Sequence, residues 1–271
     1  MRDGIHFISG LPRSGSTLLS ALLRQNPAAH ASITSPVAPI TLAVLREMSA
    51  ANEGEVFIDD AKREAIVRGV FSGFYARERG AKTIFDTNRL WTSKLSLLTT
   101  LFPQAKVVCC VRDVPWIYDS FERLIRRNRF QPSRIFDFDA GGNVYTRFNQ
   151  LNAPTGIVGF AWTCLRQAFF GEATDRLLLV TYESLVAAPQ TTLDAIYDFV
   201  GMPRFAHDLE NIEIEVGEFD ARLGAPGLHS VGKTIHVSRR ATILPPELYA
   251  RVDGDTFWRD PLQNPRAVKI L

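Results

Sequence analysis

The sequence has few cysteines, little net charge and no long apolar run, and each shortage argues against a class of protein. Its three cysteines among 271 residues form neither a metal-binding pattern nor a disulfide framework. No apolar stretch approaches the ~18 residues of a spanning helix, and the N-terminal run predicts neither signal peptide nor membrane anchor. The net charge of +2 does not favour nucleic acid as a partner. These features predict a cytoplasmic protein.

The composition is ordinary for a globular protein, with 46% hydrophobic and 22% charged residues. Along the chain, segments typical of buried strands alternate with segments of helical periodicity. The predicted strands cover 5–9, 83–85, 105–111 and 177–181, and the predicted helices cover 17–25, 60–79, 91–102, 114–127, 155–172 and 191–200. This alternation predicts an α/β fold with a parallel sheet and helices on both faces, in a single domain over residues 1–271.

The turn between the first strand and helix is the most informative segment. Gly10 and Gly15 stand five residues apart, and Ser16-Thr17 open the helix. This is the layout of a phosphate-binding loop, with Ser16 in place of the lysine and a positive charge at Arg13 instead. Helix-start N–H groups and an arginine fork can hold phosphate or sulfate. The missing lysine argues against nucleoside triphosphate hydrolysis. The alternative is a glycine-rich turn without a ligand.

A second anion-binding pattern follows the strand predicted at 105–111. Arg112 lies at the end of that strand, and Ser120 lies two turns into the next helix. An arginine and a hydroxyl in this arrangement can grip a second phosphate through charge-assisted hydrogen bonds. The same helix ends in three further arginines, for which a solvated helix end is the favoured interpretation: Arg123, Arg126 and Arg127.

The order and spacing of these motifs resemble the sulfotransferases that use 3′-phosphoadenosine 5′-phosphosulfate as the sulfuryl donor. The resemblance extends over about residues 5–202 and implies a phosphate-binding-loop core like that of nucleotide kinases. It implies that the 5′-phosphosulfate is bound by Arg13, Ser14, Gly15, Ser16 and Thr17. It also implies that Arg112 and Ser120 bind the 3′-phosphate and that Tyr182 lies near the adenosine.

Within that family, the run Pro-Arg-Ser-Gly-Ser-Thr is most similar to the protein-tyrosine sulfotransferases and their bacterial relatives. This branch implies that Arg13 is catalytic. It also uses a lysine from the segment after the next strand, where this chain has Arg89, which we take as the substitute cation. A late serine-containing loop touches the donor in this branch, which implies the same role for Ser230 and Lys233.

The general base is the main departure from the tyrosine branch. The position of its glutamate corresponds to Thr34 here, and no carboxylate lies nearby. The sequence leaves the base open among Asp86, His229, His30 and Glu47. A phenol has a pKa of about 10 and needs less help in losing its proton than an alkanol, so the missing glutamate fits a phenolic acceptor somewhat better.

The sequence therefore predicts a metal-independent sulfotransferase that acts on an acceptor hydroxyl, a phenol such as a peptide tyrosine being favoured. A small-molecule, sugar or lipid hydroxyl stays open as the acceptor, as do a nucleotide kinase-like enzyme and an inactive donor-binding module. We expect the irregular segments 28–60, 128–156 and 217–244 to frame the acceptor pocket. The oligomeric state is open, a homodimer included.

Overall fold

The computed structural model describes residues 4–78, 80, 83–214, 216–236 and 240–271. Within these ranges, six strands form one parallel sheet in the order β2-β3-β1-β4-β5-β6. This confirms the predicted α/β class. The strands are β1 (Ile5–Gly10), β2 (Ala29–Ala31), β3 (Thr83–Thr87), β4 (Val107–Val111), β5 (Leu177–Thr181) and β6 (Lys269–Ile270).

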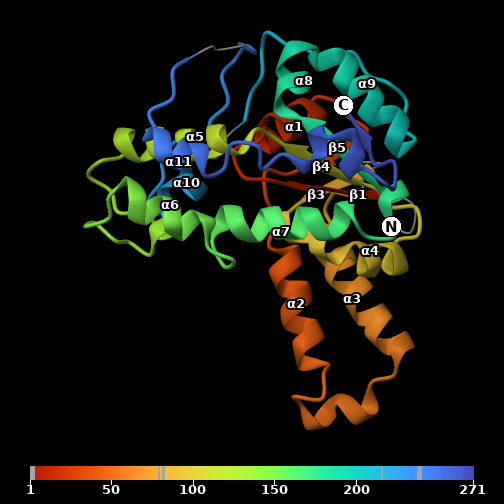
Figure 1. Cartoon of the computed structure of the whole chain (residues 1–271). Helices are drawn as coiled ribbons and strands as arrows, with labels where there is room; N and C mark the ends of the chain where they lie inside the picture. Colours follow the sequence, from red (N-terminus) through yellow and green to blue (C-terminus); the bar gives the residue numbers. More distant parts are fainter. Residues whose placement is uncertain (1–3, 79, 81–82, 215, 237–239) are drawn as a thin grey trace.

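Helices connect the strands and cover both faces of the sheet (Figure 1). They are α1 (Ser16–Leu23), α2 (Val37–Glu47), α3 (Asp60–Phe74), α4 (Leu95–Leu101), α5 (Val114–Arg127), α6 (Val144–Asn152), α7 (Ile157–Phe169), α8 (Tyr182–Ala187), α9 (Pro189–Val200), α10 (Gly217–Arg222) and α11 (Pro246–Ala250). Across the described ranges, none of these helices has the length and apolar character needed to span a bilayer.

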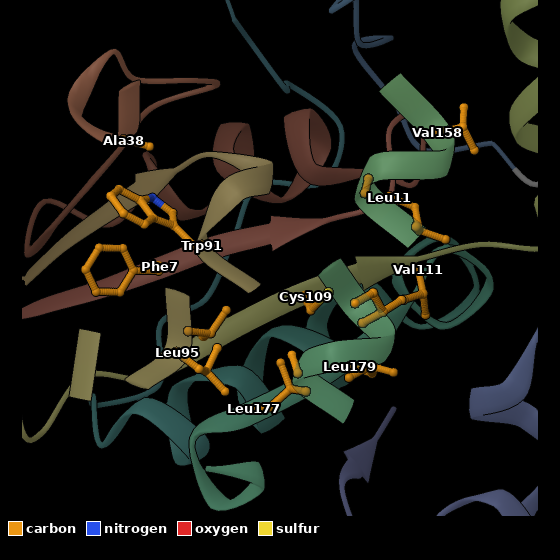
Figure 2. Close-up of a cluster of buried hydrophobic side chains, with 14 of the residues drawn as sticks. Phe7, Leu11, Ala38, Trp91, Leu95, Cys109, Val111, Val158, Leu177 and Leu179 are labelled. Atoms are coloured by element: carbon orange, nitrogen blue, oxygen red, sulfur yellow. The ribbon is translucent and has the colours of Figure 1, made fainter. Parts of the chain in front are cut away.

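The central strands are buried on both faces, and their side chains alternate between two apolar clusters. Phe7, Cys109 and Leu177 point to the face covered by α3, α4, α5 and α7 (Figure 2). Their neighbours along the strands, such as Ile8 and Val108, pack on the opposite face against α1, α8 and α9. This alternation is the two-residue period of a strand, and it explains why these segments are continuously apolar.

Helices α2 and α3 pair and project from the body of the molecule as an arm (Figure 1). The short helical turn between them, Glu53–Phe57, carries exposed apolar side chains at Val56 and Phe57. Arg63 on α3 ties the arm together through the carbonyl oxygen of Met48 and the carboxylate of Glu55. The arm begins inside the segment 28–60.

Three expectations need correction. The segment 28–60 is not an irregular loop, because it contains β2 and α2, and 128–156 contains α6. The helix predicted at 91–102 starts as a 3₁₀ turn, Arg89–Lys94, and becomes α-helical only at Leu95. In that turn the hydroxyls of Thr92 and Ser93 donate to carbonyl oxygens three residues back, which favours the tighter winding.

Candidate functional site

Four neighbouring strands end at one edge of the sheet, and each is followed by a predicted site segment. The loop with Arg13 follows β1, Arg89 follows β3, Arg112 follows β4, and Tyr182 follows β5. In parallel sheets ligands bind at this carboxyl edge. A cavity of about 420 Å³ lies there, and the side chains of all four segments contribute to its wall. This volume is in the usual range for small-molecule sites.

The loop from Gly10 to Thr17 needs its two glycines for different reasons. Gly10 has φ +120°, and a Cβ on it would lie 2.1 Å from the carbonyl oxygen of Cys110 on the neighbouring strand. Gly15 has φ +94° and begins α1, and a Cβ there would crowd Tyr182. Arg13 also adopts a positive φ, of 60°. The loop is thus folded back over the start of α1.

The start of α1 leaves backbone donors directed at the cavity. Gly15 provides no side-chain cap, and the first amide of this helix with a carbonyl partner is that of Leu19, which bonds to Gly15. Ser16 and Thr17 line the cavity at the positive end of the helix dipole, and within the described part of the chain their amides have no carbonyl partner. Ser14 differs, because its side chain is buried and donates to the carbonyl oxygen of Pro12.

The two predicted anion-binding motifs are joined by direct contacts. Nε of Arg13 donates to Oγ of Ser120 at 3.0 Å, and Nη1 of Arg112 donates to the carbonyl oxygen of Arg13 at 3.2 Å. The guanidinium of Arg112 also lies 4.1 Å from the centre of the Tyr182 ring, a cation–π contact. Among the described residues, the buried Nε of Arg112 has no hydrogen-bond partner.

The cavity is strongly positive. Four arginines line it and no Asp or Glu does, within the part of the chain that the structure describes: Arg13, Arg89, Arg112 and Arg240. Burial and the neighbouring Arg112 lower the pKa of Arg13 to about 10, and burial also lowers the pKa values of Arg89 and Arg112. A guanidinium group keeps its proton at neutral pH in proteins, so the cavity favours an anionic ligand.

Several described residues of the segment 217–244 line this cavity. They are Leu228, His229, Ser230, Val231, Gly232, Thr234, Ile235, His236 and Arg240. Ser230 thus lies at the cavity, whereas Lys233 is exposed and outside the described lining. From 28–60 only Ile33 and Thr34 line the cavity, and no residue of 128–156 does. The segment 128–156 packs around α6 instead, so it does not frame this cavity.

The structure separates the four candidates for the general base. Asp86 is fully buried and accepts hydrogen bonds from Ser35, Tyr75 and Trp91, so it is held away from the cavity. Glu47 is exposed on the projecting arm beside Arg46, and His30 packs on Tyr75 outside the cavity wall. Only His229 lines the cavity.

His229 is held by an aspartate that the sequence does not single out. Asp220 is 1% exposed, and its two carboxylate oxygens accept from the backbone N–H of His229 at 2.9 Å and from Nδ1 of its ring at 2.6 Å. Asp220 lies on α10, nine residues before the histidine, within a segment without clear periodicity. No spacing rule links the two side chains.

Arg240 is a second site residue that sequence reasoning missed. Its Nη2 donates to Asp119 at 2.8 Å, and Asp119 also accepts from Arg123 and from the backbone N–H of Ile243. Asp119 precedes Ser120 on α5, so this buried carboxylate fastens the C-terminal segment beside the second motif. In the sequence, the adjacent basic residues at 239–240 were the feature that could have indicated Arg240. Among the described residues, no cluster of three or more His, Cys, Asp or Glu side chains forms a metal site.

Much of the sequence matches known proteins. A model of the sulfotransferase family matches residues 6–207. Protein-tyrosine sulfotransferase 1 of Danio rerio is 26% identical over 203 residues, which cover 73% of this chain and 53% of that protein. Protein-tyrosine sulfotransferase 2 of Gallus gallus is 27% identical over 202 residues, covering 72% and 50%. The chain thus spans about half the length of these curated relatives.

Solved structures support the fold. A sulfotransferase from Alicyclobacillus acidocaldarius superposes with a TM-score of 0.51 at 15% identity, over 82% of this chain and 92% of that chain. A sulfotransferase from Mycobacterium avium superposes with a TM-score of 0.50 at 14% identity, over 96% and 78%. At these identities the likeness concerns the arrangement of strands and helices alone.

Proposed function

The chain belongs to the sulfotransferase family, and from this premise we propose that it transfers a sulfuryl group from 3′-phosphoadenosine 5′-phosphosulfate to an acceptor hydroxyl, a phenol such as a peptide tyrosine. The observation that carries the choice of donor is the charge of the cavity. Its described lining has four arginines and no carboxylate, in a protein whose net charge is only +2. A donor with a 5′-phosphosulfate and a 3′-phosphate matches that concentration of charge.

The first motif would bind the phosphosulfate end of the donor. The free N–H groups at the start of α1 and the guanidinium of Arg13 converge there, and both favour tetrahedral oxyanions. Ser16 and Thr17 add hydroxyls to the same wall. Ser14 would support the loop through its bond to Pro12 rather than by contact with the donor.

The second motif would bind the 3′-phosphate. Arg112 has a buried Nε without a partner among the described residues, and Ser120, whose hydroxyl accepts from Arg13, lines the same cavity. Arg240, which donates to Asp119 of α5, adds a third donor to the cavity wall. The Tyr182 ring, already covered by Arg112, offers a surface next to the adenosine. Ser230 would close over the donor from the late loop, whereas the exposed position of Lys233 gives no support for direct contact.

The chemical step depends on fixed positive charge more than on covalent catalysis by the protein. The acceptor oxygen attacks sulfur in line, and negative charge grows on the oxygen that bridges sulfur and phosphorus in the donor. Arg13 and the loop amides would stabilise the transferring group, and Arg89 would neutralise the leaving phosphate. Preorganised donors of this kind typically supply ~10²–10³ in rate each.

A transfer assay with radiolabelled donor tests the proposal. The protein is incubated in chelator with the labelled donor and, in separate reactions, with a tyrosine peptide, a small phenol, a sugar and a long-chain alcohol. We expect label to move to a phenolic acceptor, and we expect no transfer of phosphate from ATP with magnesium. Transfer of phosphate without transfer of sulfate would overturn the proposal in favour of a kinase-like enzyme. Label on the sugar or long-chain alcohol alone would retain the donor and correct the acceptor.

A further inference from the structure

A second cavity opens beside the donor cavity. It has a volume of about 880 Å³ and lies between α10 and the segments that flank it. The two cavities are adjacent, because three residues line both: Ile33, Ser230 and Val231. The proposed donor chemistry leaves this second cavity unused.

The lining of the second cavity combines apolar and polar groups. Ile214, Val216, Phe219 and Pro226 contribute carbon-rich surface, in addition to the shared Ile33 and Val231. Glu218 and Arg222 also contribute to the lining, but they form an ion pair with each other, and both side chains are exposed. This ion pair therefore adds no net charge to the second cavity. The second cavity contrasts with the donor cavity, which favours anions.

The pair His229–Asp220 lies at the junction of the two cavities. His229 lines the donor cavity, and Asp220 lines the second one. Asp220 fixes the imidazole by accepting from Nδ1, and the ring of Phe219 lies 5.5 Å from it, centre to centre. Among the described residues, Nε2 of His229 has no hydrogen-bond partner. A carboxylate that holds one ring nitrogen and leaves the other available is the arrangement of an oriented base.

We propose that the second cavity binds the acceptor as a hydroxyaryl group, and that His229, oriented by Asp220, is the base that removes its proton. This inference rests on the proposed function and adds to it the place where the acceptor binds and the path of the proton. An aromatic ring suits the apolar patch of this cavity that includes Phe219 and Val231. The hydroxyaryl group comes either from a free phenol or from a tyrosine side chain of a peptide.

The step balances as a single displacement. The proton of the acceptor hydroxyl moves to Nε2 of His229, and the acceptor oxygen forms a bond to sulfur. The bond between sulfur and the bridging oxygen of the donor breaks, and its electron pair stays on the phosphate of 3′-phosphoadenosine 5′-phosphate. The proton on His229 is then lost to solvent. Asp220 stays ionised throughout and stabilises the imidazolium.

The charges around His229 set its protonation before reaction. Among the described residues, the charged groups that act on it are Asp220 on α10, Arg13 in the β1 loop and Arg89 after β3. Burial lowers the pKa of His229, the two arginines lower it further, and Asp220 opposes them. The imidazole is therefore neutral at pH 7 and can accept a proton. We expect kcat to fall as the pH decreases through the pKa of His229.

The base is tested with His229→Gln and two phenols of different acidity. We expect kcat for 2-naphthol to fall by ~10²–10⁴, and kcat for 4-nitrophenol, a much stronger acid, to fall far less. Binding of 3′-phosphoadenosine 5′-phosphate should be unchanged. His30→Gln, a histidine outside the cavity wall, is the matched control. Equal losses for the two phenols, or no loss, would overturn the role of His229.

Asp220 is tested as a positioning residue by the pH profile. Asp220→Asn removes the charge that raises the pKa of His229, so the acidic limb of the kcat profile should move to lower pH while kcat falls. Asp220→Glu should restore part of kcat and move the acidic limb part of the way back. An acidic limb that stays in place in the folded Asn variant, checked by circular dichroism, would contradict the pairing.

The acceptor cavity is tested with Phe219→Ala, whose side chain is 40% exposed and so adds little to the core. KM should rise about tenfold for 2-naphthol, for a tyrosine peptide, or for both, and the acceptor that responds identifies the source of the hydroxyaryl group. KM for the donor should not change. Phe130→Ala, at a remote phenylalanine that is 92% exposed, is the control. Unchanged acceptor KM values, or sulfation of a sugar or lipid alcohol alone, would overturn this inference while the proposed donor stands. Failure to bind the donor product would remove the proposed function itself.

Discussion

Arg13 and Ser120 are 107 residues apart in the chain, yet Nε of Arg13 donates to Oγ of Ser120 at 3.0 Å. The contact joins the loop after β1 to helix α5 after β4, so the two anion-binding motifs form one surface. Arg112 reinforces it by donating to the carbonyl oxygen of Arg13. In the proposed reaction, the groups that hold the 3′-phosphate thus also orient the arginine that acts on the sulfuryl group.

Loss of Arg13 should therefore nearly abolish transfer. We expect Arg13→Ala to lower kcat by ~10²–10³ or more, because a fixed cation next to the developing charge is removed. The side chain is half-buried and no carboxylate among the described residues forms an ion pair with it, so the fold should be retained. Steady-state kinetics and circular dichroism measure the two effects. A folded variant with wild-type turnover would show that Arg13 is not catalytic.

Ser120 should contribute to donor binding mainly through the 3′-phosphate. A hydrogen bond to a charged group contributes about 1.5–3 kcal/mol, so Ser120→Ala should weaken binding of 3′-phosphoadenosine 5′-phosphate by about tenfold or more. Binding of adenosine 5′-phosphate, which lacks the 3′-phosphate, should change little. Calorimetric titration of both ligands measures the difference. Ser72→Ala, at an exposed serine on α3, is the control. An equal loss for both ligands would contradict the assignment.

Arg89 should affect turnover more than donor affinity. In the proposed reaction Arg89 neutralises the leaving phosphate, whose charge is greatest in the transition state. We expect Arg89→Gln to lower kcat by ~10²-fold with a much smaller change in donor KM. Arg24→Gln, at an exposed arginine outside the cavity wall, should leave both values unchanged. A large rise in donor KM with normal kcat would make Arg89 a binding residue only.

Two glycines should respond to alanine in opposite directions. Gly10→Ala places a Cβ 2.1 Å from the carbonyl oxygen of Cys110 at φ +120°, so it should destabilise the protein by about 3 kcal/mol or more. Gly69 lies within α3 with no atom within 4 Å of its added Cβ, so Gly69→Ala should stabilise it by about 0.5–1 kcal/mol. Urea unfolding measures both changes, and a stable Gly10→Ala variant would refute the close approach of β1 and β4.

His6 should make the fold acid-sensitive. Burial, with the nearby Lys106, lowers the pKa of His6 from 6.5 to about 4, and its Nδ1 accepts from the backbone N–H of Lys106. The unfolded chain therefore binds more protons between those pH values. The free energy of unfolding should decrease as the pH falls from 6.5 to 4, by up to about 1.4 kcal/mol per pH unit. The slope of the free energy of unfolding against pH should be smaller in His6→Gln than in the wild type. An equal slope in the two proteins would exclude His6 as its source.

Much of the fold could be predicted because local patterns and tertiary structure agree. The strands β1, β4 and β5 are continuously apolar in the sequence since both of their faces are buried. Turn residues such as Gly10 and Pro115 mark where a strand ends or a helix begins. The arm of α2 and α3 was not predicted as a unit, because α2 buries only a few side chains and its apolar period is weak.

The candidate site was predictable to the extent that each residue follows a strand. Arg13, Arg89 and Arg112 meet because β3, β1 and β4 are neighbours, which a parallel sheet makes expected. The partner of His229 was not predictable, because Asp220 reaches it across a segment whose conformation depends on tertiary contacts. The same holds for Arg240, which Asp119 fixes from another part of the chain.

The central claim is that the arginine-lined cavity binds a nucleotide through both of its phosphate groups. Calorimetric titration with 3′-phosphoadenosine 5′-phosphate in chelator, with adenosine diphosphate as the comparison, tests it most directly. We expect tight, magnesium-independent binding of the first ligand and much weaker binding of the second, because only the first places a phosphate at Arg112 and Ser120. Equal binding of the two nucleotides, or no binding of either, would contradict the account.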